Sequence, residues 1–278
     1  MNFFKLSLIT ISLLLVGCGS SSNKSDTPNN TKVTTVKDAQ KNFKAVTAFA
    51  SMPSSIAKVN QFNTLQLQKV FNKTQKKQQR SCKNGGDITV LISEDKKTTE
   101  MTFNNCKMDN ASYDGSMKLI QMNKNDSKIE ITKYTYSNAQ GSGYMNISME
   151  EKTVNNISTM SINGVVNQKN SSGEINNMSV TNMKFVEKET SAESWSTIDG
   201  SMSIESKCFT GTYSFQTIEK LIETKDETDN LKSGILKLNG ATYTFNNPNV
   251  TIKIGSKIET ILQSELEKRF EIKTVCDE

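Results

Sequence analysis

The stretch Gly143–Glu150 reads Gly-Tyr-Met-Asn-Ile-Ser-Met-Glu, and its pattern indicates the fold class. Its apolar residues, Met145, Ile147 and Met149, alternate with residues of the opposite face. Because successive side chains of a strand point to opposite sides, this period of two predicts a strand. One dry face and one wet face are typical of antiparallel sheets.

The same alternation recurs from Asp87 onward. It is found in the groups Ile88/Val90/Ile92, Thr99/Met101/Phe103, Phe209/Tyr213/Phe215, Ala241/Tyr243/Phe245 and Val250/Ile252/Ile254. The composition is rich in Asn, Ser, Thr and Lys with interspersed apolar residues, which suits a half-buried sheet better than a helical bundle. We therefore predict an all-β domain over residues 81–278, built as a long, twisted antiparallel meander of about ten strands.

Three short segments of this region share one pattern: an apolar residue, Asp or Asn, Gly, a small residue and an apolar residue. They are Tyr113–Met117, Ile162–Val166 and Ile198–Met202. Asn-Gly and Asp-Gly suit either a hairpin turn or a bend within a strand, since Gly tolerates positive φ and close packing. The spacings differ between the segments, which favours a meander over a strict solenoid.

Helical periodicity is confined to the two ends of the body. Apolar residues of 33–51 fall on one helical stripe, and a second helical stretch covers 54–76 after Met52-Pro53. We assign residues 33–80 to an N-terminal helical segment packed on the sheet. Near the C-terminus, Ile258, Ile261, Leu262, Leu266 and Phe270 recur at helical intervals, which predicts a short helix with a continued strand as the alternative.

The N-terminus has the features of an export signal. Lys5 precedes an apolar run over residues 6–16, which is too short to cross a bilayer as a helix. The segment Leu15-Val16-Gly17-Cys18 resembles the lipobox of bacterial lipoproteins. The resemblance implies that residues 1–17 are a signal peptide and that Cys18 carries diacylglycerol and an acyl chain such as palmitate.

This lipoprotein resemblance also implies a place in the cell. Gly19, not Asp, follows the cysteine, so by analogy with enterobacterial sorting we expect anchoring in the outer membrane, facing either the periplasm or the cell surface. Residues 18–32 then form the lipidated cysteine and a flexible polar tether. The expected membrane partner is reached through the covalent lipid on Cys18, and no other cofactor is expected.

Cysteine usage agrees with an exported protein. The chain has five cysteines, and after Cys18 takes the lipid four remain. Of the three possible pairings we favour Cys82–Cys106, which lies symmetrically about an expected hairpin turn near Glu94, and Cys208–Cys276. The alternatives, free thiols or a zinc site, are disfavoured because these spacings are not those of Cys-x-x-Cys ligands.

A second resemblance covers residues 82 to about 250. The order Cys82-Lys-Asn-Gly-Gly, Phe103-Asn-Asn-Cys106 and Asp114-Gly-Ser-Met117 is similar to a group of poorly characterised, β-rich proteobacterial lipoproteins. The resemblance implies the sheet and the disulfides and adds no chemistry.

Most catalytic chemistries find no support in this sequence. The chain has no histidine, which removes Ser-His-Asp and Cys-His catalysis and His-based zinc sites. Ser55-Ile-Ala-Lys58 matches Ser-x-x-Lys without its companion motifs. The carboxylate pair Glu187/Glu189 fits solvated charge on the wet face better than a glycosidase pair.

The remaining binding chemistries are also disfavoured. Ten methionines lie between Met101 and Met202, and their alternation with polar residues fits core packing better than Cu(I) binding. No metal site is expected. The net charge of +5 is mild for 278 residues, so nucleic acid is not expected as a partner.

We therefore expect a non-enzymatic binding or structural module of the cell envelope, whose partner is an envelope protein or lipid. One alternative is a carrier of lipids or other hydrophobic ligands with a half-barrel cavity. A second alternative is a surface-exposed adhesion protein.

Overall fold

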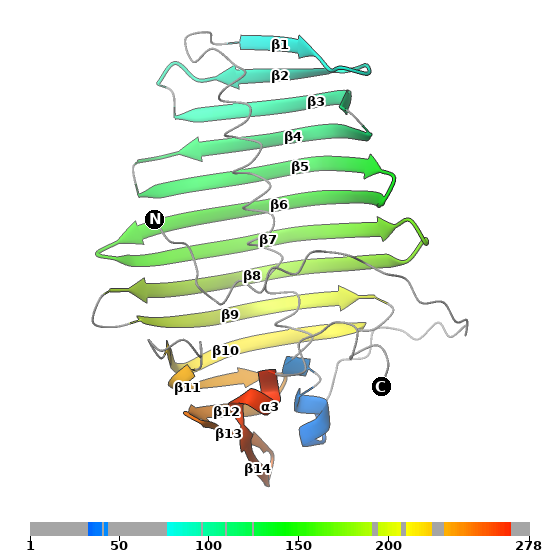
Figure 1. Cartoon of the computed structure of the whole chain (residues 1–278). Coiled ribbons are helices and arrows are strands. Elements are labelled where there is room, and N and C mark those ends of the chain that lie inside the picture. Colours follow the sequence, from blue (N-terminus) through cyan, green and yellow to red (C-terminus); the bar gives the residue numbers. More distant parts are fainter. Residues whose placement is uncertain are drawn as a thin grey trace.

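The computed structural model describes residues 33–40, 42–43, 77–95, 97–108, 110–123, 125–190, 194–206, 210–223 and 231–267. They form one sheet of fourteen antiparallel strands, in which every strand pairs with the next one along the chain (Figure 1). The predicted fold class and meander are confirmed. The expected count of about ten strands is too low.

The strands are β1 (Lys77–Ser81), β2 (Asp87–Ile92), β3 (Thr98–Met108), β4 (Ala111–Gln121), β5 (Asp126–Asn138), β6 (Gly141–Val154), β7 (Ile157–Asn170), β8 (Ile175–Glu189), β9 (Ser194–Glu205), β10 (Thr210–Glu223), β11 (Leu231–Leu238), β12 (Ala241–Asn246), β13 (Asn249–Ile254) and β14 (Lys257–Leu262). The short helix α3 (Gln263–Glu267) follows β14, and residues 36–40 and 42–43 are helical before the sheet.

The two faces of the sheet differ in composition, as the alternation predicts. One face carries the buried apolar side chains, and we call it the core face. Met117, Ile131 and Ile252 on this face are 3%, 2% and 0% exposed. We call the opposite, mostly polar face the outer face.

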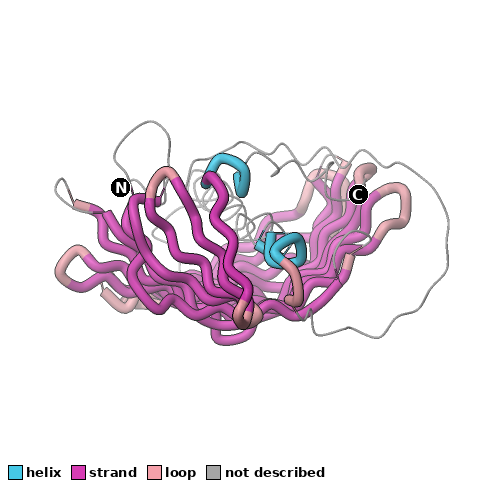
Figure 2. The backbone as a smooth tube through the Cα atoms, turned by 90° about the horizontal axis from the view of Figure 1, so that it is seen from below, coloured by secondary structure: helices cyan, strands magenta, loops and turns pink. Residues whose placement is uncertain are grey.

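The sheet is strongly curved. Figure 2 shows it nearly end-on as a trough, with both helical segments lying inside the concavity. The core face is therefore the concave face, and the outer face is the convex one.

Register shifts in the middle of the long strands accompany this curvature. They occur between Phe103 and Cys106 of β3, between Ile131 and Tyr134 of β5, and between Thr181 and Lys184 of β8. Each extra residue of a β-bulge bends and twists its strand locally. A series of such bulges across neighbouring strands curves the sheet as a whole.

The repeated Asx-Gly segments hold these bulges in place. The Asp114 carboxylate accepts the backbone N–H of Asn105 at 3.2 Å, and the Asn163 side chain accepts that of Asn182 at 2.7 Å. Asn105 and Asn182 have φ of 45° and 49°, so both are left-handed residues inside a bulge. The Asx side chain thus binds an amide that the bulge has released from the ladder.

The glycine of the same motif receives a bulge from the neighbouring strand. A Cβ on Gly200 would lie 2.5 Å from the carbonyl oxygen of Asn182, and one on Gly115 would lie 2.4 Å from that of Lys133. Only glycine permits this approach. The sequence left two interpretations of the Asx-Gly segments open, a hairpin turn and a bend within a strand. The structure shows that they are bends within strands.

The helical residues before the sheet lie against the core face of β12. Thr35 and Asp38 form a capping box, in which the Thr35 side chain accepts the Asp38 N–H and the Asp38 carboxylate accepts the Thr35 N–H. The Tyr243 hydroxyl donates to the carbonyl of Ala39 at 2.7 Å, and the rings of Phe43 and Tyr243 are 5.2 Å apart. This confirms that N-terminal helical residues pack on the sheet.

Two predicted boundaries differ from the structure. Residues 77–80, which the sequence assigned to the helical segment, form strand β1. The predicted C-terminal helix is wrong for Ile258, Ile261 and Leu262, which lie in β14, while Leu266 lies in α3. Residues 44–76 and 268–278 lie outside the described part, and the helix predicted over 54–76 stays a prediction.

Candidate functional site

The predicted disulfide between Cys82 and Cys106 is present, with 5.5 Å between the Cα atoms. It joins the loop after β1 to β3, and the intervening β2–β3 turn contains Glu94 as predicted. The lipidation residue Cys18 and the pair Cys208–Cys276 lie outside the described residues. Ser55 and Lys58 of the Ser-x-x-Lys match also lie there.

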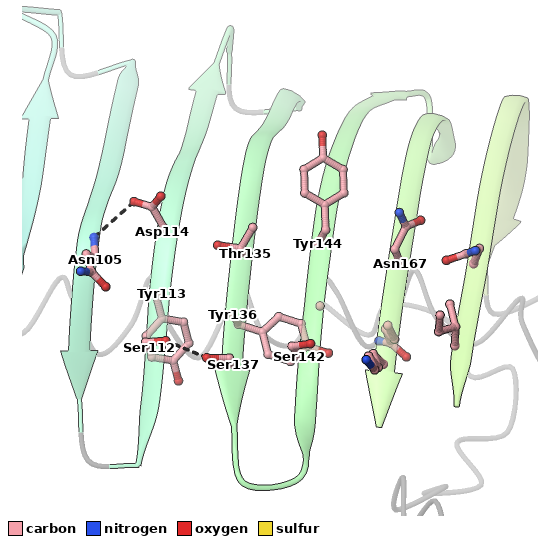
Figure 3. Close-up of a pocket in the computed structure, with 15 residues that line it drawn as sticks. Asn105, Ser112, Tyr113, Asp114, Thr135, Tyr136, Ser137, Ser142, Tyr144 and Asn167 are labelled. Carbon is pink, nitrogen blue, oxygen red and sulfur yellow. Dashed lines mark hydrogen bonds between the residues drawn. The ribbon is translucent and has the colours of Figure 1, made fainter. Parts of the chain in front are cut away.

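A groove of about 610 Å³ lies on the outer face across strands β3 to β8 (Figure 3). Its outward side chains form two rows that cross the strands, because directly paired residues of an antiparallel sheet share a face. The first row is Asp114, Thr135, Tyr144, Asn167 and Asn177. The second row is Ser112, Ser137, Ser142, Lys169 and Ile175.

We call these ten residues the outer groove. Asn105 adds an amide at its β3 end. The side chains are hydroxyls, amides, one aromatic ring, the aliphatic Ile175 and one charge of each sign, Asp114 and Lys169. A groove with convergent polar groups and an aromatic ring is a candidate binding site.

Some polar groups of the outer groove are already engaged with protein. Asp114 accepts the Asn105 N–H, the hydroxyls of Ser112 and Ser137 lie 2.8 Å apart, and Asn177 donates to Glu205 at 3.0 Å. By contrast, three side chains in the middle of the first row make no hydrogen bond to protein within the described part of the chain. They belong to Thr135, Tyr144 and Asn167.

Tyr144 is distinctive among the tyrosines. The chain has six, and the other five, at positions 113, 134, 136, 213 and 243, lie on the core side of the sheet. Tyr144 alone faces outward, half-buried, between Thr135 and Asn167 on the adjacent strands. A partly exposed aromatic ring flanked by unpaired polar groups is a typical recognition element.

The predicted position of Glu187 and Glu189 on the wet face is wrong. They pair with Ser196 and Ser194 of β9 and share the core side with Phe185, while Lys184 and Lys188 face outward. The bulge between Thr181 and Lys184 adds a residue to β8, and a shift by one residue exchanges the two faces of all that follows.

Four carboxylates consequently gather at one rim of the core face. Burial, followed by the charges of Glu189, Glu223 and Glu151, raises the pKa of Glu187 to about 7. Ser194 donates to Glu223 at 2.9 Å, and burial raises the pKa of Glu151. In the described residues, no group of three or more His, Cys, Asp or Glu is arranged to hold a metal ion.

The methionines behave as the sequence predicts. Seven of the ten, Met101, Met117, Met145, Met149, Met178, Met183 and Met202, are buried on the core face. They fill the concavity as flexible apolar side chains.

Among the described residues, no helix is long and apolar enough to cross a membrane. Comparison with protein-family models, curated proteins and solved structures gives no match to this chain.

The outer groove is the part of the site that sequence reasoning missed. The alternation placed Tyr144 on the wet face, and that was the available signal. Its assembly with Asp114, Asn167 and Asn177 depends on the register of five strands, which the sequence alone does not reveal.

Proposed function

We propose that this chain is a lipid-anchored module of the outer membrane that binds another component of the cell envelope and carries out no catalysis. The anchor rests on the lipobox-like segment ending at Cys18. Replacing Cys18 by Ser should abolish labelling by radioactive palmitate and release the protein from washed membranes. Retention of the label in this variant would contradict the anchor.

One observation carries the binding proposal: the outer groove. Its central side chains, Thr135, Tyr144 and Asn167, lie on a rigid sheet and make no hydrogen bond within the described part of the chain. Binding sites built on strands are precise, because the hydrogen-bonded ladder fixes each side chain. The polar outer face remains available to a partner while the apolar core face lies in the concavity.

The test is co-sedimentation of the Cys18→Ser chain, which cannot be lipidated, with envelope fragments. The double variant Tyr144→Ala/Asn167→Ala should sediment several-fold less than its parent. Thr244→Ala, on the outer face of β12, serves as the matched control and should behave like the parent. A double variant that sediments like the parent would overturn the proposal.

A second candidate function is a carrier of hydrophobic ligands, and the curvature of the sheet favours it. The concave face is lined by methionine and aliphatic side chains, a surface suited to an acyl chain. Against it, these side chains are buried, which fits a filled core better than an open cavity. Native mass spectrometry decides between the two: a co-purifying lipid supports the carrier, and a clean protein mass supports the binding module.

The adhesion alternative depends on which side of the outer membrane the chain faces. Protease treatment of intact cells separates the two topologies. Digestion of the chain in intact cells supports an adhesion protein, and protection until the cells are broken supports a periplasmic binding module.

A further inference from the structure

We infer that the outer groove binds an extended, uncharged polysaccharide of the β-1,4-linked type, lying across strands β4 to β8. The inference rests on the proposed function and adds the chemical class of the ligand. Four properties of the groove carry it: its charge, its repeat, its aromatic ring and its hydrogen-bonding groups.

The charge of the groove selects an uncharged ligand. Among the described residues that line it, Asp114 and Lys169 are the only ones with ionic side chains, and they have opposite signs. A polyanion would need several lysines or arginines along the groove, and a polycation would need several carboxylates. Neither set is present in the lining.

The composition also argues against a protein partner or an acyl chain. Protein interfaces have an apolar centre with aromatic anchors, and acyl chains need a continuous apolar surface. The outward side chains here include one aliphatic residue, Ile175, at the edge of the groove. The centre holds the hydroxyl of Thr135, the amide of Asn167 and the single ring of Tyr144, without an apolar cluster around that ring.

The geometry of the rows fits a chain molecule with a short repeat. Each row places one side chain per strand, and neighbouring strands lie about 4.8 Å apart. That step is close to the length of one sugar residue in an extended β-1,4-linked chain. Five strands give four steps, or roughly 19 Å, which corresponds to about four sugar residues.

The central side chains of the outer groove can contact both the flat face and the polar edge of a sugar ring. The half-buried ring of Tyr144 offers a flat apolar surface to the C–H face of a pyranose, as aromatic side chains do for other flat partners. Thr135 and Asn167 on either side offer a hydroxyl and an amide, which can both donate and accept hydrogen bonds. Hydroxyl and acetamido groups at the edge of the sugar have the same dual capacity.

The experiment is isothermal titration of the chain with chitohexaose and with cellohexaose, two uncharged β-1,4-linked hexasaccharides. We expect binding of at least one, with the affinity rising from the disaccharide to about the tetrasaccharide and then levelling off. Tyr144→Ala should weaken binding by roughly tenfold. Tyr144→Phe should retain most of the affinity, because the ring is kept.

Thr244→Ala is the matched control and should bind like the parent chain, and Asn167→Ala gives an independent result if Tyr144→Ala does not fold. Absence of binding to both hexasaccharides overturns the inference, as does equal binding by Tyr144→Ala in its folded state. Tighter binding of heparin than of either hexasaccharide overturns it as well. If the sugars fail but co-sedimentation with envelope fragments still depends on Tyr144 and Asn167, the binding proposal stands and the polysaccharide class is wrong.

Discussion

Replacing Gly200 by alanine tests the physical origin of the curved sheet. A Cβ at this position would lie 2.5 Å from the Asn182 carbonyl oxygen and 2.6 Å from the Met183 Cα, and both are backbone atoms. Gly240 provides the control, since it also has positive φ, but a Cβ added there would meet no atom within 4 Å beyond its chain neighbours. Both substitutions therefore place alanine at positive φ, and only the one at Gly200 adds overlap with a neighbouring strand.

The expected losses of unfolding free energy follow from the positive φ and from the steric overlap. Positive φ costs an alanine about 1–2 kcal/mol at either position. Overlap with a backbone that cannot move away adds about 1–3 kcal/mol at Gly200. Gly200→Ala should thus lower the free energy of unfolding by about 2–5 kcal/mol, and Gly240→Ala by about 1–2 kcal/mol.

Urea unfolding followed by tryptophan fluorescence measures this difference. The single tryptophan, Trp195, is buried on the same strand as Gly200 and carries the Lys220 ammonium 3.8 Å from its ring, so unfolding should change its emission. Equal destabilisation by the two variants would mean that the close approach of the bulge to Gly200 has no energetic role, which is the opposite of what the structure predicts.

Three further predictions concern other parts of the sheet. The double variant Cys82→Ala/Cys106→Ala, which removes a disulfide between residues 24 apart in the sequence, should lower the free energy of unfolding by about 3 kcal/mol in urea titrations, and an unchanged midpoint would contradict this. Tyr243→Phe removes the hydroxyl that donates to the Ala39 carbonyl and should cost about 0.5–1.5 kcal/mol, with faster hydrogen exchange over residues 36–40; unchanged exchange there would argue against the contact. Because the pKa of Glu187 is raised to about 7, the folded state keeps a proton that the unfolded state loses near 4.5, so the unfolding free energy should fall as pH rises between these values. Glu187→Gln should flatten that slope, and a slope equal to that of the parent would be the opposing result.

The alternation of apolar and polar residues was sufficient to predict the fold class. In Gly143–Glu150 each side chain lies on the face that its position in the pattern predicts. The same holds for Ala241, Tyr243 and Phe245, which are buried together. These strands lie within the sheet and have one buried face, which is the condition under which a period of two appears in the sequence.

The period of two is lost in a strand that has no buried face. Strand β14 lies at the edge of the sheet, and five of its six residues are exposed, so its apolar residues follow no period of two. The spacing of Ile258, Ile261 and Leu262 then matched a helix by coincidence. The strand count was too low partly because β11 to β14 are only six to eight residues long and follow one another closely.

Bulges limit the prediction of the site. One extra residue in β8 transfers Glu187 from the predicted wet face to the core side. The Asx-Gly segments signalled the bends, but the partner residue of each bulge is fixed only by the register of neighbouring strands. For the same reason the rows of the outer groove could not be assembled from the sequence, although the outward position of Tyr144 could.

We propose that this chain meets its partner through the outer groove on the convex face of the sheet. Site-specific photo-crosslinking in intact cells tests it most directly, with the photoreactive residue placed at Tyr144 in one variant and at Thr244 of β12 in the other. We expect a crosslinked adduct of higher mass from position 144 and none from position 244. Crosslinking of equal yield at both positions, or none at position 144 in a chain that is folded and membrane-bound, would contradict the claim.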